Sequence, residues 1–591
     1  MRTSQPTECR APLKVSVVVP THNSGETVLT GLRSFLAQTL PRTDFEVVYV
    51  DDGSTDGTPA MLESEAARRG AGRTVRVIRT PNSGWPGRPR NIGMDAARGE
   101  FVFFVDDDDW LAPEALERTC ERARETGADI VIGRIAGHGR RAPRALFEEP
   151  LSHADLRSDV ALLASMTVHK LFRRDFLQRN ELRFEEGRVR LEDHMFTLRA
   201  YLLTDRVATV HDYTCYHWVK HRGDEHNISY RTIEPGPYVD SIRKVLAILD
   251  APGTRVAPGR HRYRLAANWY GKKALARLGG RSLLDQPRGR REQWLDAVGA
   301  LAAEMPPQAD AALPTRLRVV AALARHGELE LLEEHARFEA GIDHRPRVGH
   351  AEWDSGRLTL ACDTRLVRRR EKRARAEPLA FHRAQGRYVL RLPPGVAAVP
   401  EAAEAADFTG AVRRSNVRGL LRHREGGTVV SVPLDHRVVE VPPGPEGNRT
   451  AEMTARVARR LRLPAWLTSL LPGARRERDV CALRFETEFT VDPSSADNGR
   501  PLAPGTWDLQ LQLGCGGWRF ARTLPGHSID VPADDEPQPA AEVPTPPAAA
   551  GHRQDGPALI RKGTSRRAHR PPRRGRAAAR PVPSGSGREK R

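Results

Sequence analysis

The strongest constraint in this sequence is an acidic run that follows directly on an apolar one. Phe101–Val105 is a run of apolar, largely β-branched and aromatic residues, and Asp106–Asp109 continues it without a break. The first pattern predicts a buried strand. Four neighbouring carboxylates repel one another and commonly coexist only beside a cation. The sequence therefore predicts a strand end that holds Mg²⁺ or Mn²⁺ through hard oxygen ligands, and the interpretation without a ligand is a solvated acidic turn.

The chain around this run alternates strand and helix patterns over residues 13–225. Such alternation requires crossover connections and predicts a largely parallel, Rossmann-like α/β sheet. In open α/β sheets, ligands bind at the carboxyl ends of the strands. The predicted strands are Val15–Val19, Phe45–Val50, Val75–Ile78, Phe101–Val105 and Ile130–Ile132, and the predicted helices are Thr27–Gln38, Pro59–Arg69, Arg90–Ala97 and Glu114–Thr126.

The rest of the chain changes character twice. Residues 226–345 are rich in Leu, Ala and Arg at helical spacing, which predicts a helical linker domain. Residues 346–463 contain short β-like runs that predict a sandwich-like module, and residues 464–535 form either a second such module or its continuation. Residues 1–12 and the Pro/Arg-rich residues 536–591 are predicted to be disordered.

The formal charge of +19 over 591 residues is concentrated at one end of the chain. Residues 551–591 contain thirteen Lys or Arg and only two acids. Such a tail can contact an anionic lipid surface, an anionic polymer or RNA, or it can be a solvated segment that binds nothing. Because no nucleic-acid motif accompanies it, we expect no nucleic-acid partner.

The lengths of the apolar runs and the spacing of the cysteines indicate the cellular compartment of the protein. No run of 18 apolar residues is present and the first residues lack an apolar stretch, so we expect neither a transmembrane helix nor a secretory signal. The six cysteines are widely spaced without a CxxC pair, which is typical of a reducing environment. We therefore predict a cytoplasmic protein, with peripheral contact at the inner face of the plasma membrane through its basic tail.

Polar residues also follow the first two predicted strands. Pro20, Thr21 and Asn23 form a turn that can frame a base or a ribose. Asp51 and Asp52 follow the second strand, where a carboxylate can accept a hydrogen bond from a pyrimidine imide N–H. Alone, each segment is typical of a turn with a helix cap. Together with the acidic run they favour a nucleotide that lies across one rim of the sheet.

The segment between the third strand and the next predicted helix adds amides and cations. This segment contains Asn82, Arg88, Arg90 and Asn91. Arginine offers a planar fork to phosphate or carboxylate. An arginine pair in a loop is usually solvent-facing, but this pair precedes a helix N-terminus on the rim of the acidic run, which favours anion binding.

Four segments together resemble the family 2 glycosyltransferases with the GT-A fold. The resemblance implies a UDP-sugar donor and a uracil contact made by Asp52 or its neighbour Asp51. It implies that Asp106 and Asp108 are the metal-binding pair, with Asp108 the direct ligand and Asp107 the variable residue between them on the nucleotide-sugar side. The segments are Val17–Asn23, Val50–Asp56, Pro89–Gly93 and Phe104–Trp110.

An acidic pair further along the chain resembles the catalytic base segment of the inverting members of this family. The resemblance implies that Asp193 is the general base and that Glu192 supports it. The chemistry requires such a group, because an acceptor hydroxyl that attacks an anomeric carbon must lose its proton. If the pair has no catalytic role, the helix dipole alone explains two acids at the start of a helix.

Downstream histidines complete the resemblance. In this family a histidine past the base often completes the metal sphere, which implies His217, with His221 second. Arg222 and Asn227–Ser229 resemble the mobile lid over the diphosphate.

The whole layout is similar to that of wall teichoic acid glycosyltransferases. This implies inverting, metal-dependent transfer of a sugar, typically an N-acetylhexosamine, to a hydroxyl of an anionic polyol-phosphate polymer. It also implies that the C-terminal β modules mediate trimer formation or contact with the polymer. One alternative is a transferase for another capsule, exopolysaccharide or cell-surface glycan. The other is a decayed transferase that acts as a glycan-binding scaffold, against which the presence of Asp106, Asp108 and Asp193 argues.

Overall fold

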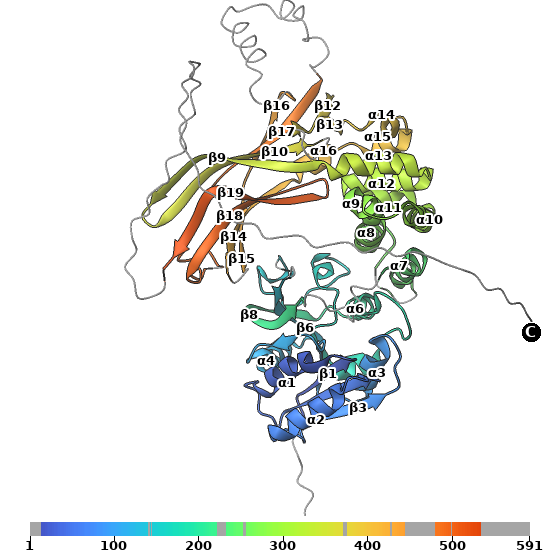
Figure 1. Ribbon diagram of the computed structural model, residues 1–591, viewed down its shortest axis with the longest axis vertical. Helices are drawn as coiled ribbons and strands as arrows, with labels where there is room; N and C mark the ends of the chain where they lie inside the picture. Colours follow the sequence, from blue (N-terminus) through green and yellow to red (C-terminus); the bar gives the residue numbers. More distant parts are fainter. Residues whose placement is uncertain are drawn as a thin grey trace, which may run out of the picture. The chain divides into compact units, whose positions relative to one another are not determined.

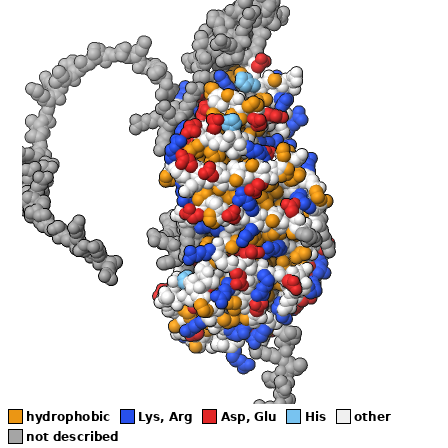
Figure 2. Space-filling model, turned by 90° about the vertical axis from the view of Figure 1, so that its right-hand side faces the viewer, with side chains coloured by type: hydrophobic (Ala, Val, Ile, Leu, Met, Phe, Trp, Pro, Cys, Tyr) orange, Lys and Arg blue, Asp and Glu red, His pale blue; other side chains and the backbone are white. Residues whose placement is uncertain are grey.

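The computed structural model describes residues 13–532, apart from residues 140, 141, 144, 221–231, 252, 253, 255, 370–374, 426, 427, 444–478 and 498 (Figure 1). The two ends predicted to be disordered, 1–12 and 536–591, lie outside the described residues, as do His221 and the lid residues Arg222 and Asn227–Ser229. On the face drawn in Figure 2, basic and acidic side chains are interspersed. The expected succession of an α/β domain, a helical region and an antiparallel β part is confirmed.

The N-terminal part is built on one mixed sheet of eight strands. Its strands are β1 (Val15–Thr21), β2 (Phe45–Asp52), β3 (Val75–Thr80), β4 (Phe101–Phe104), β5 (Trp110–Leu111), β6 (Ile130–His138), β7 (Leu171–Arg173) and β8 (Val207–Val219). Their order is β3-β2-β1-β4-β7-β6-β8-β5. Strands β1 to β4 run parallel, whereas β7 runs antiparallel between β4 and β6, so that β6 again has the direction of β4. The prediction of a largely parallel sheet missed this three-residue strand.

The helices that connect these strands lie where the sequence places them. They are α1 (Val28–Leu36), α2 (Thr58–Arg68), α3 (Gly87–Ala96) and α4 (Ala115–Thr126), followed by α5 (Arg174–Arg179) and α6 (Glu192–Leu203). Helix α3 packs closely on β1 and β2, because Gly93 has no side chain: a Cβ there would lie 2.4 Å from Val18 Cγ1. This approach fixes the start of α3 near the strand ends.

The register of the sheet brings three strand ends to one edge. Thr21 at the end of β1 is paired with Asp51 on β2, and Val18 on β1 is paired with Phe104 on β4. Because these strands run parallel, the polar residues that follow them share that edge, as expected.

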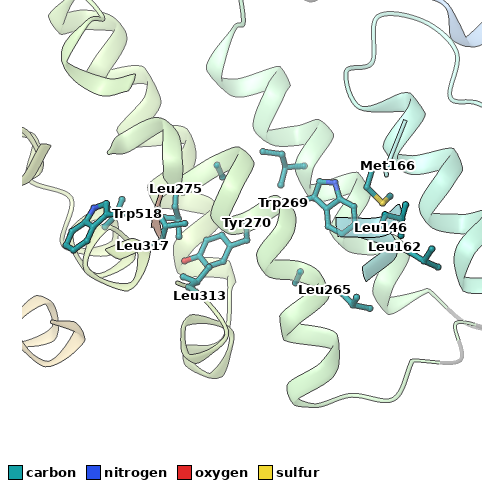
Figure 3. Packing of buried hydrophobic residues seen from close by; sticks show 14 of the residues in the cluster. Leu146, Leu162, Met166, Leu265, Trp269, Tyr270, Leu275, Leu313, Leu317 and Trp518 are labelled. Carbon is teal, nitrogen blue, oxygen red and sulfur yellow. The ribbon is translucent and has the colours of Figure 1, made fainter. Parts of the chain in front are cut away.

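The helical region continues the hydrophobic core of the N-terminal part. In Figure 3, Trp269 and Tyr270 lie between Met166 on one side and Leu313 and Leu317 on the other, and all five belong to one buried cluster. The helices are α7 (Pro235–Asp250), α8 (Arg260–Trp269), α9 (Gly280–Leu284), α10 (Arg288–Glu304), α11 (Pro307–Ala311), α12 (Thr315–His326) and α13 (Leu329–Ala340).

The β part consists of two antiparallel sheets. The strands are β9 (Ile342–Asp354), β10 (Arg357–Arg368), β11 (Glu377–Pro378), β12 (Phe381–Ala384), β13 (Arg387–Leu390), β14 (Asn416–His423), β15 (Val429–Leu434), β16 (Arg437–Val441), β17 (Val480–Val491), β18 (Gly505–Cys515) and β19 (Trp518–Val531). Short helices α14 (Pro394–Ala397), α15 (Pro400–Ala405) and α16 (Thr409–Arg413) interrupt them. The four-stranded sheet has the order β15-β14-β18-β19, and the seven-stranded sheet contains β9 to β13, β16 and β17.

Each sheet combines strands from both of the predicted β-rich ranges. β17 pairs with β10 in one sheet, and β18 pairs with β14 in the other. This pairing favours the continuation that the sequence left open over a separate second module. In the ranges that the structure describes, no helix combines the length and the apolar composition needed to cross a membrane.

Candidate active site

The turns after β1 and β2 are tied together by side chains from both. The Asn23 side-chain carbonyl accepts a hydrogen bond of 2.8 Å from the Thr55 backbone N–H, and the Asn23 backbone N–H donates to Ser54 Oγ at 2.9 Å. Thr21, in the last position of β1, lies 2.7 Å from Ser24 through their hydroxyls, and Pro20 is buried within the strand. These contacts give the strand edge a fixed polar surface.

The two aspartates at the end of β2 have different surroundings. Asp52 is surrounded by donors, since its carboxylate accepts hydrogen bonds from the backbone N–H groups of Ser83 and Gly84 and from the Ser83 hydroxyl at 2.9–3.2 Å. Asp51 accepts one bond of 3.2 Å from the Ser54 backbone N–H, and its Oδ1 is buried with no partner among the described residues. A buried acceptor without a donor is costly unless a ligand supplies one.

Arg90 joins the acidic run to the start of α6. Its guanidinium donates to Asp106 Oδ1 at 2.8 Å and to Glu192 Oε1 at 3.1 Å. The Arg90 side chain is only 6% exposed. Burial alone would lower the pKa of Arg90, but the charges of Asp106 and Glu192 raise it above its usual value. The side chain is therefore a permanently charged bridge between two carboxylates.

Asp106 is held ionised by two cationic or hydrogen-bonding partners. His169 Nε2 lies 2.9 Å from Asp106 Oδ2, on the side opposite the Arg90 contact. Burial would raise the pKa of Asp106, but His169 and Arg90 together hold it well below its usual range. The His169 ring stacks on Tyr216 with centroids 4.5 Å apart, which fixes its orientation.

Asp109 lies deeper than Asp106 and is held by the strand that passes behind it. The Tyr216 hydroxyl donates to Asp109 Oδ2 at 2.6 Å, and the Val219 backbone N–H donates to Oδ1 at 2.8 Å. Burial raises the pKa of Asp109 to about 9, with the charges of Asp106 and Asp108 adding to the effect. Repulsion of this kind is relieved when a cation binds.

One group of side chains in the described part of the chain could hold a metal ion. Ligand atoms of Asp106, Asp109 and His169 all lie within 4.8 Å of one another. Carboxylate oxygens with one imidazole suit Mg²⁺ or Mn²⁺, so the residues present fit a divalent ion. Of the predicted metal ligands, Asp106 belongs to this group, whereas Asp108 and His217 do not.

Asp107 points to the β1 turn. Its Oδ2 accepts a hydrogen bond from the Ser24 hydroxyl, and burial raises its pKa. His217 lies in a different setting: its ring stacks on Trp110 with centroids 3.5 Å apart, and its Nδ1 is 2.9 Å from His138 Nε2. Burial, with the neighbouring His138, lowers the pKa of His217 to about 4, so its imidazole is neutral near pH 7.

The predicted acidic pair begins helix α6. Leu191, just before it, adopts a left-handed conformation with φ of 63°, and Glu192 and Asp193 occupy the first turn. Glu192 is buried and accepts hydrogen bonds from Arg90 and from Trp85 Nε1 at 3.3 Å. Burial, together with the charge of Asp193, raises the pKa of Glu192 to about 7.

Two buried basic side chains lie close to this pair. Burial lowers the pKa of Lys170 to about 7, against an opposing effect of the Asp193 charge. Burial also lowers the pKa of His194 to about 4, and its Nδ1 accepts a hydrogen bond of 3.1 Å from Trp269 Nε1. Of the two basic neighbours of Asp193, His194 is therefore neutral near pH 7 and Lys170 is partly protonated.

The remaining predicted residues lie on the loop before α3 and in its first turn. Asn91 is buried and holds Phe184 from both sides, through bonds of 2.9 and 3.0 Å to its backbone N–H and carbonyl. Asn82 is exposed and its amide lies 3.1 Å from the His22 ring nitrogens. Arg88 is half-buried within the first turn of α3.

The sequence reasoning missed His169 and Tyr216. Both come from segments without a local motif, because β7 is short and Tyr216 lies in the middle of the long strand β8. The available signal was small: His169 and Lys170 interrupt an otherwise apolar run from Val168 to Phe172, and both are buried.

Comparisons with known proteins agree with this geometry. The sequence model of "Glycosyl transferase family 2" matches residues 16–153, and that of "Glycosyl transferase TarS linker domain" matches residues 235–336. The chain is 28% identical over 342 residues to the poly(ribitol-phosphate) beta-glucosyltransferase of Bacillus spizizenii, a match that covers 58% of this chain and 53% of the relative. The chain thus spans about half the length of that relative.

Two further proteins are similar over a larger share of their own length. The chain is 30% identical over 252 residues to the poly(ribitol-phosphate) beta-N-acetylglucosaminyltransferase TarP of Staphylococcus aureus, which covers 42% of this chain and 76% of the relative. The crystal structure of residues 1–349 of S. aureus TarS in complex with UDP-GlcNAc has a TM-score of 0.50 and 26% identity, covering 62% of this chain and 99% of that one. With the acidic strand end, the buried Arg90 bridge and these matches, the chain belongs to family 2 of the glycosyltransferases.

Proposed function

We propose that this protein transfers a sugar from a UDP-sugar to a hydroxyl of an anionic polyol-phosphate polymer, with inversion and with a divalent metal ion. The observation that carries the proposal is the bridge from Asp106 through Arg90 to Glu192, which connects the acidic strand end to the acidic pair of α6. The activities after which the two poly(ribitol-phosphate) relatives are named and the UDP-GlcNAc complex of the TarS fragment support it.

The strand edge would hold the donor. The unpartnered Oδ1 of Asp51 is suited to accept the imide N–H of a uracil, whereas the Asp52 carboxylate already holds the following loop. Thr21, Asn23 and Asp107 border the same edge and would frame the ribose. A divalent ion would supply charge neutralisation for the departing diphosphate. Asp106, Asp109 and His169 have the ligand atoms that converge, and the proposal adds Asp108 as a ligand on the family resemblance.

The first turn of α6 would serve the acceptor. Asp193 accepts the proton of the acceptor hydroxyl as its oxygen forms a bond to the anomeric carbon and the bond to the UDP oxygen breaks. Glu192 orients this turn through Arg90 and Trp85. Attack from the side opposite the leaving diphosphate inverts the anomeric centre.

The same proposal extends to the location, the binding partners and the oligomeric state of the protein. A nucleotide-sugar donor implies work in the cytoplasm, and the basic residues 536–591 are the segment proposed for peripheral contact with the membrane or the polymer. The β part is proposed to mediate trimer formation, as in the teichoic acid glycosyltransferases that the sequence resembles.

Donor binding provides the first test. Asp108→Asn should weaken Mn²⁺-dependent binding of UDP-GlcNAc or UDP-glucose at least about tenfold, because one carboxylate ligand of a hard cation is lost. Calorimetry with and without Mn²⁺ measures this. Asp175→Asn, at an exposed aspartate paired with Arg179, is the matched control and should bind as the unchanged protein does. No metal-dependent binding of any UDP-sugar by the folded protein would overturn the proposal.

The pH dependence of transfer should reflect Glu192. Its carboxylate must be ionised to hold Arg90, and its pKa is raised to about 7, so kcat/KM should be full above that pH and should fall as the pH drops through it. A pH–rate profile from 5.5 to 8.5 measures the effect. Glu192→Gln should remove this limb of the profile, and an unchanged limb in that variant would contradict the assignment.

A further inference from the structure

A cavity of about 1160 Å³ lies between the helical region and the β part, and none of the candidate active-site residues lines it. Helices α9 and α13 and strands β9, β10 and β19 form its walls. Eight of the residues that line it are arginines, and Asp343 is the one carboxylate among those lining residues. The charged residues of its lining are therefore almost all basic, unlike the mixed charges on the face drawn in Figure 2.

The β9 strand and its neighbour supply the most regular part of this lining. Arg345 and Arg347 are two residues apart on β9, so their side chains leave the same face of the sheet about 6.6–6.8 Å apart. Arg365 on β10 is paired directly opposite Arg345. Like charges that lie directly opposite each other destabilise a sheet. An anion bound in the cavity would offset the repulsion between these two arginines.

The other walls add arginines from separate elements. Arg281 comes from α9, Arg337 from α13 and Arg522 from β19, and all three are exposed. Arg337 also contacts Glu333 at 2.6 Å, and Arg522 contacts Asp343. The residues Arg369 and Arg375 complete the set after β10. Guanidinium groups that converge from five segments can bind several phosphates in a row.

The aromatic content of the cavity separates two classes of phosphodiester. Proteins that bind single-stranded nucleic acids usually offer aromatic rings on which bases stack. Phe520 and His344 are the aromatic residues of this lining, and they stack on each other with centroids 6.0 Å apart. His344 is buried as well. The lining favours a phosphodiester chain without bases.

We propose that this arginine-lined cavity binds an anionic phosphodiester chain of the sugar-alcohol phosphate type, and so holds the acceptor polymer at a second site outside the active site. The choice of a sugar-alcohol backbone rests on the proposed function. The cavity increases the local concentration of acceptor hydroxyls, since a polymer held at two sites dissociates more slowly than one held at either.

The test uses the full chain and a fluorescent ribitol-phosphate hexamer. Arg281→Glu/Arg345→Glu should weaken its binding about 10- to 100-fold at 50 mM salt, and should lower the slope of affinity against salt concentration. Fluorescence anisotropy measures both. Arg413→Glu/Arg519→Glu makes the same charge change at two exposed arginines outside the cavity and should bind as the unchanged protein does. The milder Arg281→Gln/Arg345→Gln variant, with UDP binding intact, shows that the fold is retained.

The outcomes separate this proposal from the proposed function. If both charge-reversed pairs weakened binding of the hexamer equally, or if neither weakened it, the cavity site would be overturned. Either result would leave the proposed sugar transfer from a UDP-sugar unaffected. Tighter binding of a thymidylate oligonucleotide with the same number of phosphates would assign the cavity to nucleic acid and overturn it too. Binding through the cavity without any sugar transfer from UDP-sugars would instead overturn the proposed function. Transfer to a single ribitol phosphate should survive in the cavity variants.

Discussion

Replacing Asp193 with Asn should lower the turnover number of sugar transfer by about 10²- to 10⁴-fold, the range that a positioned general base contributes. The amide keeps the size of the carboxylate but cannot take the acceptor proton. Asp193 lies in the first turn of α6, joined to the acidic strand end only through Glu192 and Arg90. Affinity for UDP should therefore stay unchanged. Transfer rates and calorimetric UDP binding, measured on the same preparation, test both statements.

Asp205→Asn is the matched control for this variant. Asp205 is exposed and pairs with Arg157 at 3.2 Å, outside the site, so its loss should leave turnover unaffected. Two results would contradict the assignment. One is retention of most of the activity by Asp193→Asn. The other is an equal loss of UDP binding in Asp193→Asn and Asp108→Asn, because the proposed division of roles gives donor binding to Asp108 and not to Asp193.

Replacing Arg90 with Met should cost about 3–5 kcal/mol of stability, because it leaves the buried Glu192 carboxylate and the partly exposed Asp106 carboxylate without their shared cation. The Arg90 side chain is 6% exposed and Glu192 is 10% exposed. A loss of this size lowers the melting temperature of a domain of 150–250 residues by about 6–20 °C. Differential scanning calorimetry of the transition that includes the N-terminal part measures it.

A second variant separates the buried charge from simple loss of packing. Arg90→Met combined with Glu192→Gln should recover part of the lost stability, since one of the two uncompensated charges is then absent. Arg183→Met breaks an exposed pair with Asp95 and should cost no more than about 1 kcal/mol. If Arg90→Met and Arg183→Met unfolded at the same temperature, the bridge would not contribute to stability as a buried ionic link.

The sequence predicted those parts of the site that depend on local pattern. Apolar runs followed by aspartates identify strand ends, and two acids before a helical pattern identify the start of α6. The five strands and four helices expected in the N-terminal part are present, because each has its own periodicity. Asp106 lies at the expected edge for the same reason.

Contacts across the sheet could not be predicted from local sequence patterns. His169 reaches Asp106 because β7 enters antiparallel between β4 and β6, and three residues carry too little pattern to predict that strand. Asn91, expected to face the nucleotide, holds the Phe184 backbone instead. Such a role depends on where a distant loop packs, which no local spacing encodes.

The interleaved strands of the β part have a consequence for how this region is made and inherited. β10 needs β17 as its neighbour, and β14 needs β18, although both partners come much later in the chain. During synthesis the edges of β10 and β14 that pair with these later strands therefore stay unpaired until nearly all of the β part has left the ribosome. Pairing between strands so far apart in the chain favours slow folding and protection by chaperones. For the same reason, a premature stop before the end of β17 would leave both sheets incomplete, and one within β18 or β19 would leave the four-stranded sheet incomplete. Evolution can gain or lose this region only as a whole.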